Sequence, residues 1–148
     1  MGDVTIRNAT AADLDSALGL IESLGYPGID RESFARVFKT ILNHPEMILL
    51  LAEDSHGRVV GLASISHRPQ LRLAGILVSL DELVVADAVR AQGVGRMLLD
   101  QVKSIAQTLG ARRVELETNR ARVSYQRSFY LKNGFVEVDS AVLRFQQT

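Results

Sequence analysis

Apolar residues recur along the chain with two spacings, and each spacing predicts a type of secondary structure. In residues 14–21 and 34–42 they stand three or four positions apart, which is typical of the buried face of a helix. Thr10 and Asp30 precede these segments and are residue types that favour the first position of a helix. Short alternating or continuously apolar segments instead predict strands. In the first part of the chain these are residues 4–9, 47–53, 58–67 and about 73–85.

The second half of the chain adds two helices and further strands. The elements predicted there are a helix at about 92–109, a strand at 113–118, a helix at about 122–134 and the final strands within 135–145. Gly110 is placed to end the first of these helices, and Pro69 is expected to break the chain between two strands. This alternation of strands and helices predicts an α/β fold with a mixed sheet.

Length and composition narrow the class of protein. The 148 residues are enough for one domain, so we expect a single domain over residues 1–148. Hydrophobic residues make up 47% and charged residues 23%, as in soluble globular proteins. The longest apolar run, residues 47–52, is far short of the roughly 20 residues of a membrane span. No leader pattern opens the sequence, so no membrane association and a cytoplasmic location are expected.

The chemistry-bearing residue types exclude several classes of function. The absence of cysteine excludes disulfides, thiolate zinc sites and a cysteine nucleophile. The three histidines lack the spacing of metal ligands, so no metal is predicted. Net charge is zero, but nine basic and three acidic residues lie between Arg90 and Lys132. This imbalance suits an anionic cofactor and a cationic substrate, and without a long basic run no nucleic-acid partner is expected.

The most informative segment runs from Asp81 to Leu99. An apolar strand end is followed by a loop that brings Gly93 and Gly95 into the first turn of an amphipathic helix. Glycine lets a ligand approach the backbone closely, and the N–H groups of a first helical turn have no partners within the helix. The segment therefore predicts an anion site, although glycines also open helices for purely steric reasons. A dinucleotide fingerprint is excluded, since Leu98 stands where its third glycine would be.

Two motifs resemble a known family. The loop Arg90–Arg96, of the form R-x-x-G-x-G, is similar to the acetyl-CoA loop of the GNAT superfamily of N-acetyltransferases. Residues 115–135 resemble the closing strand and helix of that family, and L-G-Y-P at 24–27 resembles bacterial small-amine and aminoglycoside acetyltransferases. The resemblance covers essentially the whole chain. It implies a mixed, mostly antiparallel twisted sheet of about six to seven strands flanked by four helices.

The resemblance implies acetyl-CoA as cosubstrate and assigns residues to it. The backbones of Leu83, Val84 and Val85 would bind the pantetheine arm. The pyrophosphate would be surrounded by Arg90, Ala91, Gln92, Gly93, Val94, Gly95 and Arg96. The asparagine motif that many members carry on the following helix is missing, so Asn119 is the candidate for a replacement contact.

Direct acetylation of an amine needs a base and an acid. An alkylamine has a pKa near 10, so a carboxylate that removes its proton assists attack on the thioester. Asp81 and Glu82 precede the cofactor-binding strand end, and strand alternation predicts that they point to opposite faces. Family patterns favour Asp81 as the base, the longer Glu82 stays open, and a structural role for both is the alternative. Tyr130 falls on the family's acid for the leaving thiolate, with an aromatic core position as its alternative.

The function hypothesis is acetyl transfer from acetyl-CoA to a primary amine of a small molecule or a protein. Its competitor is a non-catalytic acyl-CoA-binding sensor or assembly module. The sequence does not identify the acceptor, and a homodimer stays open.

Overall fold

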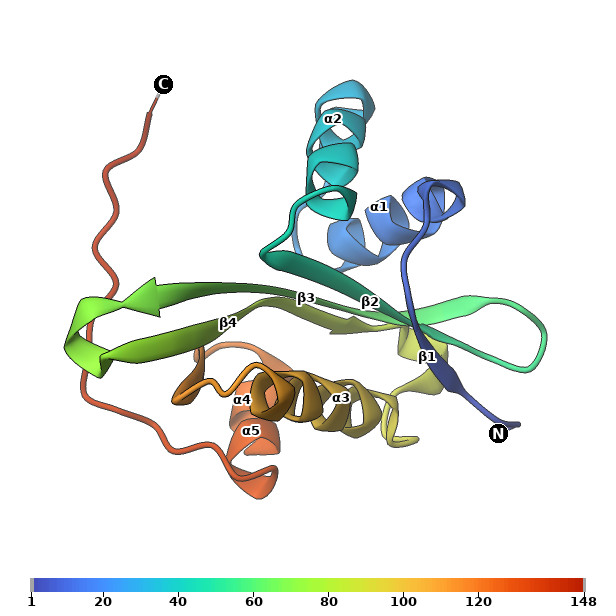
Figure 1. Ribbon diagram of the computed structural model, residues 1–148. Helices are drawn as coiled ribbons and strands as arrows, with labels where there is room; N and C mark the ends of the chain where they lie inside the picture. Colours follow the sequence, from blue (N-terminus) through green and yellow to red (C-terminus); the bar gives the residue numbers. More distant parts are fainter. Residues whose placement is uncertain (1, 148) are drawn as a thin grey trace. The chain divides into compact units, whose positions relative to one another are not determined.

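The computed structural model describes residues 2–147, which form two compact units separated between Glu117 and Thr118. The first unit contains a five-stranded sheet in the order β1-β2-β3-β4-β5 (Figure 1). Its strands are β1 (Thr5–Asn8), β2 (Met47–Glu53), β3 (Val59–Gln70), β4 (Gly75–Val85) and β5 (Arg113–Leu116). The first four pair antiparallel, and β4 pairs parallel with β5. A mixed, mostly antiparallel sheet is therefore confirmed.

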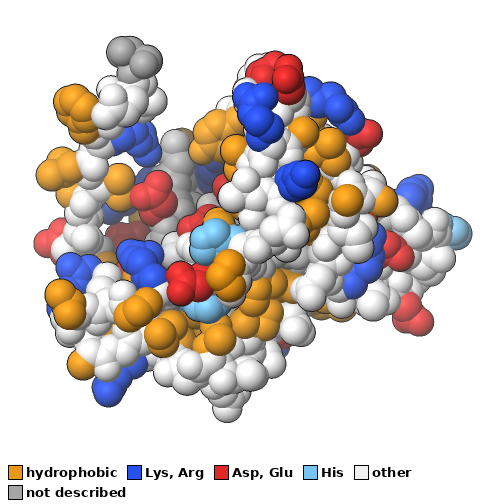
Figure 2. Space-filling model, turned by 45° about the horizontal axis from the view of Figure 1, so that its top comes forward, with side chains coloured by type: hydrophobic (Ala, Val, Ile, Leu, Met, Phe, Trp, Pro, Cys, Tyr) orange, Lys and Arg blue, Asp and Glu red, His pale blue; other side chains and the backbone are white. Residues whose placement is uncertain are grey.

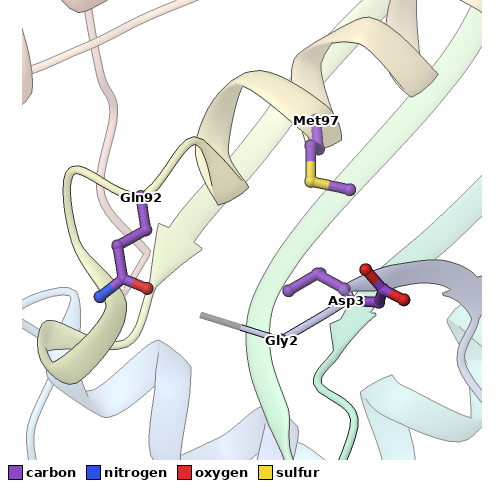
Figure 3. Close-up of a pocket in the computed structure, with 5 residues that line it drawn as sticks. Gly2, Asp3, Gln92 and Met97 are labelled. Carbon is purple, nitrogen blue, oxygen red and sulfur yellow. The ribbon is translucent and has the colours of Figure 1, made fainter.

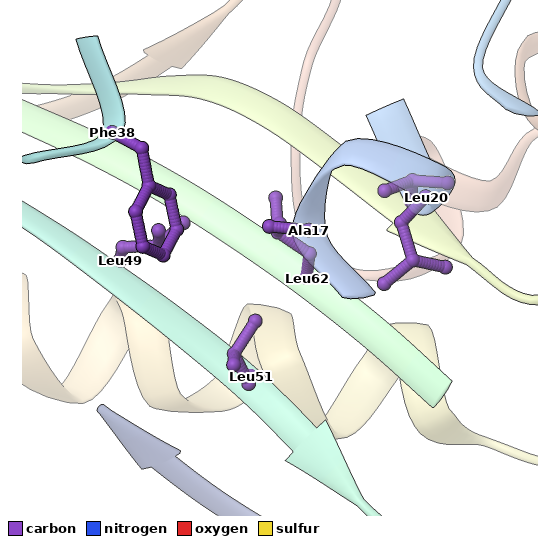
Figure 4. Close-up of a cluster of buried hydrophobic side chains, with 7 residues drawn as sticks. Ala17, Leu20, Phe38, Leu49, Leu51 and Leu62 are labelled. Carbon is purple, nitrogen blue, oxygen red and sulfur yellow. The ribbon is translucent and has the colours of Figure 1, made fainter. Parts of the chain in front are cut away.

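Three helices cover the two faces of this sheet (Figure 1). They are α1 (Leu14–Ser23), α2 (Arg31–Leu42) and α3 (Val94–Thr108). Helices α1 and α2 pack on one face, where Figure 4 shows the buried cluster of Ala17, Leu20, Phe38, Leu49, Leu51, Leu62 and Val84. Helix α3 packs on the opposite face. A Cβ at Gly61 would lie 3.1 Å from both Leu98 and Val94, so glycine allows this close approach.

Helix starts follow the predicted capping residues. The side chain of Asp30 accepts the backbone N–H of Ser33 at 2.9 Å and begins α2. Thr10 and Asp13 form a capping box over a short 3-10 turn, Ala11–Asp13, which leads into α1. The exposed side of α2 carries acidic and basic side chains together, at the top of Figure 2. Arg36 pairs with Glu32 on this helix.

Pro69 does not break the chain as predicted. It lies within β3 opposite Ile76. The adjacent backbone explains why: Arg112 donates its N–H to the Ile76 carbonyl, so Ile76 bonds toward β5, not toward β3. The backbone nitrogen of Pro69 therefore faces the opposite edge of β3, away from β4. Strand β2 ends opposite Ser66, so no strand within residues 2–147 lies beside this edge at Pro69. The missing proline N–H therefore costs no sheet hydrogen bond.

The second unit differs more from the prediction. The helix expected over about 122–134 is divided into α4 (Val123–Gln126) and α5 (Phe129–Lys132), because Ser128 adopts a left-handed conformation (φ 57°). The final strands predicted within 135–145 are absent, so the described residues contain five strands and five α-helices, not six to seven strands and four helices. Alternating side chains make a strand only where a partner edge is available. Within the described residues, this segment pairs with no strand, and Val138 and Phe145 are exposed.

No helix within residues 2–147 is long and apolar enough to span a bilayer.

A partly buried ion-pair cluster holds β1 to the start of α1. Arg7 donates two bonds of 2.9 Å to Asp13 and one of 2.8 Å to Glu53. Asp13 is only 7% exposed and also accepts the Thr10 N–H at 2.7 Å. These contacts lower the pKa of Asp13 to about 2, and the hydrogen bonds from Arg7 make the largest contribution.

We expect Asp13→Asn to reduce the free energy of unfolding by about 2 kcal/mol at pH 7, since a pKa lowered by nearly two units corresponds to that energy. The carboxylate stabilises the fold fully above its unfolded pKa near 4, and this contribution disappears as pH falls toward 2. Urea unfolding measured at pH 7 and at pH 3 should therefore show that the free energies of unfolding of the parent and Asp13→Asn differ less at pH 3. Asp15→Asn is the matched control, because the Asp15–Arg31 pair is largely exposed and should contribute little. Equal losses in the two variants would contradict the assignment.

Candidate active site

The site is organised by a bulge in β4. Ser64 of β3 lies opposite Glu82, but Ile65 lies opposite Leu80, so Asp81 is an extra residue without a partner position. Pairing of β4 with β5 stops at Leu80, one residue before the bulge. Beyond it, the strands of the described part of the chain border β4 only on the β3 side. The bulge therefore coincides with the point where β4 and β5 separate.

The bulge also changes where the two carboxylates point. The Ser64 hydroxyl donates a hydrogen bond to Glu82, and the Ser79 hydroxyl donates one of 2.8 Å to Asp81. Ser79 lies opposite Ser66, which shares a face of β3 with Ser64 because the two are two residues apart. Both carboxylates thus lie on the sheet face covered by α1 and α2. The alternation that predicts opposite faces is interrupted by the extra residue.

Glu82 and Asp81 differ in environment. Asp81 is exposed, whereas Glu82 is half-buried. Burial, and secondarily the negative charge of Asp81, raises the pKa of Glu82 above its ordinary value. A carboxylate whose proton affinity is increased in this way is suited to accept a proton from an ammonium group.

The end of β4 offers backbone groups to a ligand along its open edge. Ala86 donates its N–H to the Val60 carbonyl at 2.9 Å, so Ala86 faces β3. Backbone groups alternate along a strand, so Val84 also faces β3, while the N–H and C=O groups of Leu83 and Val85 face the edge where β4 has no partner strand. Val84 contributes a buried side chain to the core.

The glycine loop and the start of α3 provide a second set of backbone donors. Gly93, at φ 85°, is the residue preceding the helix, and the first bond within α3 runs from the Met97 N–H to the Gly93 carbonyl at 3.0 Å. The N–H groups of Val94, Gly95 and Arg96 therefore have no partners within the helix. Helix α3 begins at Val94, two residues after the predicted start at about Gln92. The positive φ of Gly93 ends the preceding loop, and the helical conformation starts with the next residue.

The two arginines of this loop are exposed and each has an acidic neighbour. Arg90 pairs with Asp87 at 2.8 Å, and Arg96 approaches Asp100 at 3.9 Å. Between them, Ala91 has a positive φ of 63°, an uncommon conformation for a residue with a Cβ. Exposed pairs are weak, so both guanidinium groups can exchange their carboxylate for a phosphate.

In the second unit, Tyr130 lies on α5 within an aromatic group. Its ring makes edge-to-face contacts with Phe129 (centroids 5.1 Å apart) and Phe135 (5.9 Å). Burial raises its pKa above the ordinary value of a tyrosine, so its hydroxyl carries a proton at neutral pH. The observed packing is the one expected of a core aromatic, and the retained proton is what an acid needs.

Asn119, the candidate for a replacement cofactor contact, caps a turn. Its Oδ1 accepts the N–H of Ala121 at 2.8 Å. In this conformation the side-chain amide N–H₂ group is the part left to reach a ligand.

Figure 3 shows an open hollow beside the start of α3, lined by Gly2, Asp3, Val4, Gln92 and Met97. Its lining includes one predicted cofactor residue, Gln92, and none of the predicted catalytic residues. The acidic Asp3 makes it unsuited to a phosphate group. Within residues 2–147, no three His, Cys, Asp or Glu side chains gather in a way that could hold a metal ion.

Sequence reasoning missed Ser64 and Ser79, the hydroxyl partners of the two carboxylates. Ser64 is 18 residues from Glu82 and meets it only through the pairing of β3 with β4. No local pattern in the sequence indicates this contact.

Comparison with known proteins identifies the family. Residues 13–135 match the acetyltransferase (GNAT) family, and the chain belongs to it. The aminoalkylphosphonate N-acetyltransferase of Salmonella typhimurium is 35% identical over 130 residues, which cover 88% of this chain and 83% of the relative. Together these findings identify the chain as an acetyl-CoA-dependent N-acetyltransferase, not a non-catalytic module.

Solved structures show the same fold. A glucosamine-6-phosphate N-acetyltransferase from Arabidopsis thaliana superposes with a TM-score of 0.82 at 19% identity, covering 98% of this chain and 99% of that one. An aminoglycoside N-acetyltransferase in complex with CoA superposes with a TM-score of 0.84 at 20% identity, covering 100% and 97% of the two chains. The predicted similarity to aminoglycoside acetyltransferases is confirmed at the level of the fold.

Proposed function

We propose that the protein transfers the acetyl group of acetyl-CoA directly to the primary amine of a small acceptor, with Glu82 as base and Tyr130 as acid. The observation that carries the proposal is the bulge at Asp81, which places a half-buried glutamate beside the open edge of β4. Because the family match begins at residue 13 and ends at residue 135, both compact units belong to the same acetyltransferase domain in this proposal.

Backbone groups would hold most of the cosubstrate. Leu83, through its N–H and C=O groups, and Val85, through its C=O group, would bond the amides of the pantetheine arm, as an added strand would. The N–H groups at the start of α3, with Arg90 and Arg96, would bind the pyrophosphate. The Val85 N–H is the candidate donor to the oxyanion that forms on the acetyl carbonyl.

In the proposed reaction, Glu82 takes one proton from the ammonium form of the acceptor and passes it to solvent. The neutral amine forms the C–N bond to the acetyl carbonyl carbon, and the C–S bond breaks. Tyr130 gives its proton to the leaving sulfur and regains one from the new amide nitrogen through solvent. The lack of cysteine supports direct transfer, since no thioester acyl-enzyme can form.

A screen of primary amines, following release of free CoA, tests the reaction. The Salmonella relative is named for aminoalkylphosphonates, so short aminoalkylphosphonates are the first acceptors to try. Amino sugars, polyamines and amino acids complete the screen. Release of CoA that no amine accelerates would contradict the proposal.

We expect acetyl-CoA at 100 times its Kd to raise the Tm of the parent by roughly 5–10 °C, because it stabilises the folded state by about 2.7 kcal/mol. Gly93→Val should abolish this increase. Apart from Gly93 and its two chain neighbours, no described residue has an atom within 4 Å of a Cβ at Gly93, so the added side chain would occupy the surface that the pyrophosphate would contact. Thermal unfolding of each variant with and without acetyl-CoA measures the effect.

Gly57→Val is the matched control. Gly57 also has a positive φ, 76°, and open space around it, so both variants carry similar backbone strain. The control should lose baseline stability but keep the increase with acetyl-CoA. If Gly93→Val folds only marginally, Gly93→Ala replaces it. An unchanged increase in the Gly93 variants would place the cofactor elsewhere.

A further inference from the structure

The sheet face that carries Glu82 has a polar stripe along β3 and β4. Three successive cross-strand pairs share this face: Ser64 with Glu82, Ser66 with Ser79, and Arg68 with Leu77. Neighbouring pairs on one face are two residues apart along the strand, or about 7 Å. The stripe thus extends over roughly 13 Å along β3, from the Ser64–Glu82 pair at one end to Arg68 at the other.

Arg68 is the notable member of this stripe. Its side chain is exposed and forms no salt bridge or side-chain hydrogen bond with residues 2–147. It also lies past the end of β2, which pairs with β3 only as far as Ser66. By contrast, Arg7, Arg31 and Arg58 each pair with a carboxylate at 2.9 Å or less. Arg68 is available for an anion that comes from outside the chain.

The charges along the stripe are ordered. Asp81 and Glu82 at one end attract an ammonium group and repel an anion, whereas Arg68 at the other end does the reverse. An arginine side chain is long enough to extend over one pair, so its guanidinium can meet an anion above the half-buried Ser66 hydroxyl. A planar guanidinium bonds two oxygens of an oxyanion at once, and a serine hydroxyl adds a third donor.

We infer that the acceptor is a short aminoalkyl oxyanion, such as an aminoalkylphosphonate, whose amine lies at Glu82 while Arg68 and Ser66 bind its anionic end. This inference rests on the proposed function, because it assigns substrate specificity to the same face as the base. Arg68 and Ser66 are thereby specificity-determining residues that do not take part in the chemical step.

The test compares 2-aminoethylphosphonate with its diethyl ester, which keeps the amine but has no negative charge on its phosphonate group. The parent should acetylate the charged acceptor with the higher kcat/KM. Arg68→Gln should raise KM for 2-aminoethylphosphonate roughly 10- to 100-fold, the effect of losing hydrogen bonds to a charged group, with little change in kcat. The same variant should leave KM for the ester unchanged, and Arg68→Lys should recover part of the loss.

Arg72→Gln is the matched control. Arg72 is exposed in the turn that joins β3 to β4, and it too forms no salt bridge with the described residues. Its replacement by glutamine removes the same charge from the protein as Arg68→Gln does. It should leave both KM values unchanged. If the parent uses the two acceptors equally well, or Arg68→Gln affects them equally, the inference is overturned while the proposed function stands. If no amine is acetylated at all, the proposed function itself is overturned.

Discussion

Replacing Glu82 by Gln is expected to lower kcat/KM by about 10²- to 10⁴-fold near neutral pH, the typical contribution of a general base. The glutamine keeps the length of the side chain and an oxygen that can accept the bond from the Ser64 hydroxyl, but it cannot take a proton. The loss should shrink as pH rises, because a larger fraction of the acceptor amine is then already neutral. Profiles of kcat/KM against pH, with saturating acetyl-CoA, measure both effects.

Asp81→Asn separates the two carboxylates in the same experiment. The negative charge of Asp81 helps to raise the pKa of Glu82, so its removal should lower that pKa. Activity requires the deprotonated base and falls as pH drops through this pKa. The acidic limb should therefore move to lower pH in Asp81→Asn, with most of the activity at neutral pH retained. A large loss in Asp81→Asn combined with an active Glu82→Gln would make Asp81 the base.

Tyr130→Phe is expected to reduce kcat by about 10²- to 10⁴-fold while leaving the affinity for acetyl-CoA intact. Phenylalanine keeps the edge-to-face contacts with Phe129 and Phe135 and removes only the hydroxyl proton. Burial raises the pKa of Tyr130, so in the parent the loss of activity from its ionisation should appear at higher pH than for an ordinary tyrosine. Steady-state kinetics and the increase of Tm with acetyl-CoA are the measurements.

Tyr125→Phe provides the control for this change in the same unit. Tyr125 is half-buried on α4, and its hydroxyl interacts with the side chain of Arg120. This variant should keep full activity. Equal activity of Tyr130→Phe and the parent would return Tyr130 to a purely structural role in its aromatic group.

The elements that the sequence predicts well are those whose causes are local. Asp30 caps α2, and residues 47–53 form β2 with the predicted bounds, because a cap and a continuous apolar run act within a few residues. Residues 135–145 show the limit of such patterns. Their alternation is that of a strand, but pairing depends on a distant edge that no local pattern describes.

The candidate site shows the same division. Gly93 and the loop around it could be read from the sequence because a glycine and a helix start lie next to each other. The relation between Asp81 and Glu82 could not, since it depends on one unpaired residue in the register of β3 and β4. Val84 illustrates the result: it was expected to bind the cofactor through its backbone, but the register directs its backbone toward β3.

The bulge in β4 makes the length of the chain, and not only its residue types, a determinant of the site. Before it, the backbone groups that face β5 belong to even-numbered residues such as Leu80, and after it the outward groups belong to Leu83 and Val85. Without Asp81, the outward-facing backbone groups before and after the bulge would alternate regularly along a single edge of β4. A longer β5 could then pair with the whole of that edge. A single missing residue would close the opening that a ligand needs. Among relatives, an insertion or deletion at this position therefore says more about function than a substitution does.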